Sequence, residues 1–129
     1  AGRPAPEQVQ PGASPQFKGG AAPLHVTIPA SGRRVALPAQ PELLLGRLDS
    51  SRGIYPDLDL TAEGGFEGGV SRAHCRIYRQ RAGFFVEDLA SDNGTWLRAQ
   101  RLPPRVPYAL RDGDELQLGQ IRLIINLPA

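Results

Sequence analysis

Three polar turns carry side chains that together can bind an anion. Arg47, Ser71 and Asn93 each lie beside a short apolar run, and Arg72 follows the serine. Arginine offers a planar fork of N–H donors, serine a hydroxyl and asparagine an amide, so such a set needs neither a metal nor a nucleophile. If the three turns converge at one end of the fold, they predict an anion-binding site.

The elements that must position these turns are short strands. No window of eleven or more residues has a helical apolar period, and short apolar runs alternate with turns. Many short strands in one domain predict an all-β sandwich. The expected strands are Leu24–Ile28, Arg34–Leu37, Glu42–Leu45, 73–79, Phe84–Asp88, Thr95–Leu97, Glu115–Leu118 and Ile121–Leu127. Alternation along 73–79 is expected to turn Cys75 inwards and His74 outwards.

The composition changes near residue 23. Residues 1–23 are rich in proline, glycine and alanine and are expected to form a disordered linker, because they offer too little apolar surface to offset the entropy of ordering. Residues 24–129 are expected to form one domain. The glycine-rich stretch 61–70 is expected to be a mobile loop, whose Glu63 and Glu67 would favour basic or neutral residues in a ligand.

Charge and cysteine content narrow the function classes. The chain has 15 basic and 13 acidic residues, a net charge of about +2, which is too balanced for a protein that coats nucleic acid. No apolar run approaches the roughly 18 residues of a membrane span. The single cysteine, Cys75, fits a reducing, cytoplasmic location and a buried thiol. No histidine–cysteine spacing suits a metal, and no cofactor is expected.

In combination these motifs resemble the forkhead-associated (FHA) domain, a module that binds phosphothreonine peptides. The similarity extends from about Leu24 to Leu127 and includes the segment 110–119, which resembles the family's last hairpin. The resemblance implies a sandwich of two antiparallel sheets with about eleven short strands. It also implies a signalling adaptor, not an enzyme, whose partner is phosphorylated by a serine/threonine kinase.

The resemblance also assigns roles to individual residues. Arg47 and Ser71 match the positions that bind phosphate, and Arg72 matches a position that usually adds a further contact. Asn93 matches the asparagine that holds the peptide backbone. Four further positions are expected to support the binding loops; they are Gly46, His74, Gly94 and Thr95.

Each of these assignments has a structural alternative. Arg47 would then be a surface arginine paired with Asp49 or Asp57. Ser71 would cap a turn, and Asn93 would serve only the tight Asn-Gly turn. At the level of the whole domain, the alternative is a β-sandwich that mediates assembly without recognising phosphate.

Asp92 departs from the commoner pattern of the family, because its carboxylate would repel a phosphate within about 6 Å by roughly 1 kcal/mol. Either it points to solvent or Arg72 neutralises it, and we favour the second. A catalytic triad of Ser71, His74 and Asp88 is the enzymatic alternative, but no nucleophile-elbow motif surrounds the serine.

The few threonines indicate where the ligand would come from. Thr27, Thr61 and Thr95 are the only ones in the chain, and all three fall inside the expected domain. The segment 1–23 therefore offers no phosphothreonine in cis, and the ligand would lie on a partner or elsewhere in a longer protein.

Overall fold

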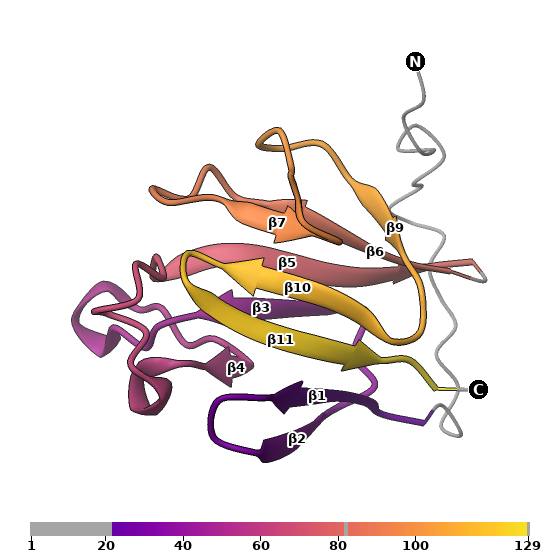
Figure 1. The fold of residues 1–129 in the computed structure, drawn as a ribbon, viewed down its shortest axis with the longest axis horizontal. Coiled ribbons are helices and arrows are strands. Elements are labelled where there is room, and N and C mark those ends of the chain that lie inside the picture. The colour runs from indigo at the N-terminus through magenta and orange to yellow at the C-terminus, as the bar shows by residue number, and fades with distance from the viewer. Residues whose placement is uncertain (1–21, 82, 129) are drawn as a thin grey trace.

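The computed structural model describes residues 22–81 and 83–128, which form two β-sheets packed face to face (Figure 1). The strands are β1 (Leu24–Ile28), β2 (Arg33–Leu37), β3 (Glu42–Gly46), β4 (Leu58–Asp59), β5 (Ala73–Gln80), β6 (Gly83–Asp88), β7 (Thr95–Leu97), β8 (Gln100–Arg101), β9 (Tyr108–Leu110), β10 (Asp114–Leu118) and β11 (Ile121–Asn126). Two short 3-10 helices, Ser50–Arg52 and Thr61–Glu63, lie in the loops on either side of β4. The predicted all-β sandwich is confirmed.

The strand order separates the sheets. One sheet runs β2-β1-β11-β10-β7-β8 and the other β4-β3-β5-β6-β9. The expectation of purely antiparallel sheets is wrong at one edge, because β3 and β4 are parallel. All eight strands expected from the sequence are present, with bounds that differ by at most one residue. The three that the sequence did not indicate, β4, β8 and β9, have only two or three residues each.

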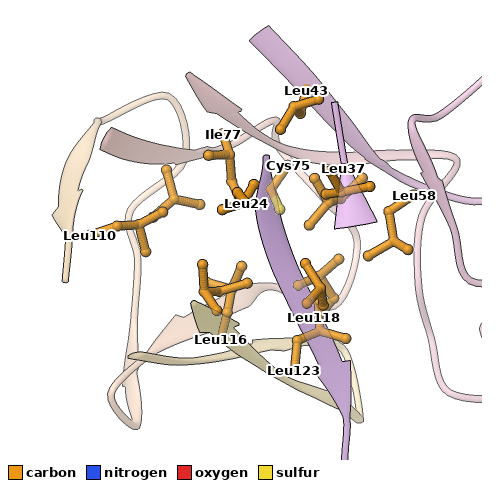
Figure 2. Close-up of a cluster of buried hydrophobic side chains, with 14 of the residues drawn as sticks. Leu24, Leu37, Leu43, Leu58, Cys75, Ile77, Leu110, Leu116, Leu118 and Leu123 are labelled. Carbon is orange, nitrogen blue, oxygen red and sulfur yellow. The ribbon is translucent and has the colours of Figure 1, made fainter. Parts of the chain in front are cut away.

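Leucine, isoleucine and valine side chains from both sheets fill the space between them (Figure 2). Cys75 lies in this core and is fully buried, and burial raises the pKa of its thiol far above the usual value. None of the helices in the described part of the chain is long and apolar enough to cross a membrane. Residues 1–21 of the expected linker lie outside the described residues, so the boundary at residue 23 stays a prediction.

A β-bulge at the start of β5 corrects the expected orientation of His74. Leu45 pairs with Cys75 but Gly46 pairs with Ala73, so His74 is the extra residue of β5. The bulge lets consecutive residues turn inwards, and His74 and Cys75 are both fully buried. Strict alternation placed the imidazole in solvent, which is wrong.

The segment 61–70 is a folded loop and not the open, mobile chain that its glycines suggested. Gly65 N donates to Leu60 O at 2.9 Å and Val70 N donates to Gly65 O at 2.8 Å. The loop is also fastened to the β10–β11 turn, where Gln120 N donates to Gly68 O at 2.7 Å. The glycines allow close packing: a Cβ on Gly68 would lie 2.8 Å from the Ile121 side chain.

We predict that Gly46→Ala destabilises the domain by about 3 kcal/mol or more. An added Cβ would lie 1.8 Å from the backbone oxygen of Arg72, and backbone cannot move aside as a flexible side chain can. Denaturant unfolding measures the loss. Gly83→Ala is the matched control, because its Cβ would meet only the Phe85 ring at 3.6 Å. Equal stability of the two variants would contradict the proposed crowding at Gly46.

Candidate functional site

The loops that follow β3, β4 and β6 lie at one end of the sandwich, on the left in Figure 1. Several hydrogen bonds join them. Arg47 N donates to Arg72 O at 3.0 Å, and Asp92 N donates to Ser71 Oγ at 3.0 Å. Asn93 Nδ2 donates to Gly69 O, also at 3.0 Å. The structure therefore brings all four predicted binding residues to one end, on neighbouring loops.

Arg47 is held in place through one edge of its guanidinium. Its Nε donates to Val70 O at 2.5 Å, and its Cζ lies over the ring of Phe66 at 5.1 Å from the centroid. No carboxylate among the described residues lies within ion-pair distance of it. The expected alternative, pairing with Asp49 or Asp57, is not found. The two terminal nitrogens thus remain as a fork for an oxyanion.

Arg72 is anchored in a similar way but by a carboxylate. Its Nε lies 2.5 Å from Oδ2 of Asp49, and Oδ1 of the same carboxylate accepts a hydrogen bond from the Ser51 hydroxyl at 2.6 Å. The hydrogen bond from Ser51 and the charge of Arg72 lower the pKa of Asp49, so its carboxylate stays ionised at neutral pH. The hypothesis that Arg72 neutralises Asp92 is therefore wrong. The Asp92 residue is exposed, and its backbone N–H is directed to Ser71.

Ser71 has its hydroxyl oriented by the neighbouring loop. Because Oγ accepts the N–H of Asp92, its own hydrogen is left to donate, and no acceptor for it occurs in residues 22–81 or 83–128. Asn93 has spare capacity as well, since one N–H of its amide is used on Gly69. These two exposed or half-exposed side chains can donate to a ligand without losing the contacts that position them.

His74 connects two of the loops from inside the protein. Its Nδ1 accepts the backbone N–H of Ser71 at 2.9 Å, and its Nε2 lies 2.8 Å from Gly94 O. This pair of bonds requires a neutral ring with the proton on Nε2, which donates to Gly94. Burial lowers the pKa of His74 below its usual 6.5, although the bond to Gly94 and the nearby Asp88 oppose the shift.

Asp88 organises the turn after β6 and was not identified as a supporting residue by sequence. Its Oδ1 accepts the hydroxyls of Ser91 at 2.6 Å and Thr95 at 2.7 Å, and its Oδ2 accepts Ser91 N at 3.1 Å. The fully buried Thr95 and the positive φ of Gly94, 89°, complete the turn. An aspartate three residues before a serine and seven before a threonine is the signal that sequence reasoning passed over.

The geometry does not assemble the alternative triad. Both ring nitrogens of His74 bond to backbone groups, Ser71 N and Gly94 O, and neither is the partner of Ser71 Oγ. The carboxylate of Asp88 accepts hydrogen bonds from the hydroxyls of its own turn.

The expectation for the two acidic residues of the segment 61–70 also changes. Glu63 forms an ion pair with Arg33 at 2.9 Å, which leaves Glu67 as the exposed acid of this loop.

Comparison with known proteins gives a consistent result. The family model described as "FHA domain" matches residues 43–119. The oxoglutarate dehydrogenase inhibitor of Corynebacterium diphtheriae is 33% identical over 103 residues, which cover 77% of this chain and 68% of that protein. The chain spans between 10% and 68% of the length of eight curated relatives that it matches.

Solved structures share the fold. One, from a study of phosphothreonine-dependent FHA domain interactions, has a TM-score of 0.63 at 25% identity and is covered to 98%, against 83% of this chain. Mycobacterium tuberculosis EmbR, in complex with a low-affinity phosphopeptide, has a TM-score of 0.66 at 26% identity. That match covers 84% of this chain and 25% of EmbR.

We predict that the stability of the domain falls as the pH drops below about 6.5. Because the folded-state pKa of His74 lies below the value of 6.5 expected in the unfolded chain, the unfolded chain takes up the proton first. The contribution of His74 is complete above pH 6.5 and is lost as the pH falls through the folded-state pKa. Thermal unfolding between about pH 7.5 and 5 measures the effect.

The second histidine provides the control for this measurement. In His25→Gln the only remaining imidazole is that of His74, so its NMR titration is unambiguous. We expect a midpoint below 6.5, accompanied by a change in the Ser71 amide signal. A midpoint at or above 6.5, with thermal stability independent of pH, would contradict the neutral bridge.

Proposed function

The chain belongs to the FHA domain family, and from this premise we propose that it binds a phosphothreonine segment of a partner protein through Arg47 and Ser71. One observation carries the proposal. The two residues retain free donors while their remaining polar atoms are used to hold them in place. Donors that are fixed before the ligand arrives lose little entropy on binding.

Each residue has a role that follows from its contacts. The terminal nitrogens of Arg47 would donate to the dianionic phosphate as charge-assisted bonds, and the Ser71 hydroxyl would add a third donor. The free N–H and carbonyl of the Asn93 amide would hold the peptide backbone. Arg72 would contribute charge from the edge of the site, while its backbone carbonyl keeps Arg47 in position.

The domain would act by recognition alone. The FHA family consists of interaction modules without enzymatic activity, and this chain would work as an adaptor downstream of a serine/threonine kinase in the cytoplasm. Two of its own three threonines suit the role of ligand poorly, because Thr95 is fully buried and the Thr61 hydroxyl donates to Asp59 at 2.6 Å. The phosphothreonine would therefore come from a partner or from another part of a longer protein.

We expect Arg47→Ala to weaken phosphopeptide binding about ten- to a hundredfold, the loss of a charge-assisted bond of about 1.5–3 kcal/mol. Calorimetric titration of a phosphothreonine peptide pool and its unphosphorylated twin measures the change. Ser71→Ala should lose less, about fivefold, because a neutral hydroxyl bond is weaker.

Arg111→Ala is the matched control for the charge. Arg111 is exposed and belongs to the turn between β9 and β10. Figure 1 shows this turn at the end of the sandwich opposite the three loops. The variant should bind like the wild type. Equal binding of the phosphorylated and unphosphorylated pools would contradict the proposal and favour a phosphate-independent assembly domain.

A separate prediction concerns Asp49. Because it anchors Nε of Arg72, Asp49→Ala should free that guanidinium and weaken phosphopeptide binding about threefold. A double-mutant cycle tests whether Asp49 acts through Arg72. In an Arg72→Ala background, Asp49→Ala should have no further effect on phosphopeptide binding. Tighter binding by Asp49→Ala would show instead that its carboxylate opposes the phosphate charge.

A further inference from the structure

The large apolar side chains that are exposed all lie on two of the loops that form the candidate site. Among the described residues they are Phe66 at 70%, Tyr55 at 65% and Leu48 at 48% exposure. All three lie on the loops after β3 and β4, which also carry Arg47 and Ser71. Isolated apolar residues on a surface are common, but their confinement to two neighbouring binding loops indicates a contact surface.

Phe66 is held outwards by the backbone of its loop. Its carbonyl accepts Gly69 N at 3.1 Å, and the preceding Gly65 donates to Leu60 O at 2.9 Å. Gly65 has no room for a side chain, since a Cβ would lie 2.7 Å from the same Leu60 oxygen. The position of the ring is therefore set by the loop and not by collapse onto the core.

The ring of Phe66 lies against the guanidinium of the anion site. Cζ of Arg47 lies over it at 5.1 Å from the centroid, so the ring shields one side of the guanidinium from water. A second cation on this ring would be repelled by Arg47, and an anion would meet the negative face of the ring. An apolar side chain meets neither penalty.

We propose that Phe66 is a specificity-determining residue that selects a bulky apolar side chain close to the phosphothreonine of the ligand. This inference rests on the proposed phosphothreonine binding and adds the class of peptide. An extended peptide advances about 3.3 Å per residue, so a ring beside Arg47 is within reach of side chains up to about three positions from the phosphothreonine. Leu48, next to Arg47 in the chain, adds apolar surface to the same loops.

The experiment compares phosphothreonine peptides that differ by leucine, asparagine or lysine at one position, for each of the three positions on either side. Leucine and asparagine have nearly the same shape, so their ratio isolates the apolar contact. For the wild type we expect about fivefold tighter binding of leucine than of asparagine at one or two positions. In Phe66→Ala this ratio should fall to about twofold or less.

Two further variants separate the possible outcomes. Phe66→Leu keeps an apolar side chain but loses the ring over Arg47, so it should retain part of the leucine preference. Arg47→Ala should weaken all phosphopeptides together, which reports on phosphate binding and not on the apolar contact. Thermal unfolding confirms that each variant is folded.

The results distinguish the two proposals. Phosphate-dependent binding with a leucine-to-asparagine ratio near one, or with a ratio unchanged in Phe66→Ala, would overturn the role of Phe66 alone. A preference for lysine at the position sensitive to Phe66 would overturn it as well. Binding that is independent of phosphate would overturn the proposed function and this inference with it.

Discussion

The bridge made by His74 is the constraint on which the binding end depends. One imidazole, fully buried, accepts Ser71 N and donates to Gly94 O, and so fixes the distance between the loop that supplies the serine and the turn that supplies the asparagine. Gly94 O accepts a second bond, from Gly119 N at 3.0 Å, which ties the same point to the β10–β11 turn. Only a neutral ring can make both contacts of His74. Burial in the low-dielectric interior favours the neutral ring, and in this way it helps to hold the two surface loops in position. The bulge in β5 is what allows the ring to be buried at all.

Both arginines of the site are also held in position by contacts within the protein. Arg47 and Arg72 are each held at Nε, one by a carbonyl and the other by the Asp49 carboxylate, which leaves their terminal nitrogens directed elsewhere. Anchoring a long, flexible side chain by one edge removes rotamers before a ligand binds. The loops therefore supply the donor side chains and also fix their positions, because backbone oxygens and short polar side chains of the loops restrict where the arginine N–H groups can lie. The three hydrogen bonds that the Asp88 carboxylate accepts within its own turn restrict the position of Asn93 in the same way.

Much of this could be predicted from the sequence, because the motifs are local. Period-two alternation and turn residues gave the longer strands, and the spacing of Arg47, Ser71 and Asn93 placed them at one end. What failed depended on contacts between distant segments. A bulge shifts the register by one residue and reverses an alternation argument, which is why His74 was expected in solvent. The glycines of 61–70 suggested mobility, whereas they permit close packing against Leu60 and Ile121. Ion pairs such as Arg33–Glu63, thirty residues apart, leave no local pattern.

The exposed apolar residues of the binding loops have a different role from the polar donors. A buried core of mostly leucine, isoleucine and valine side chains fills the space between the sheets, and the exposed ring of Phe66 adds little to that burial. Backbone hydrogen bonds of the loop nevertheless hold Phe66 in place beside Arg47. Polar donors specify that a phosphate is present, but every phosphothreonine offers the same oxygens. Discrimination among phosphorylated partners must therefore come from side chains next to the phosphate site, and Phe66 is the largest exposed one that directly contacts its arginine.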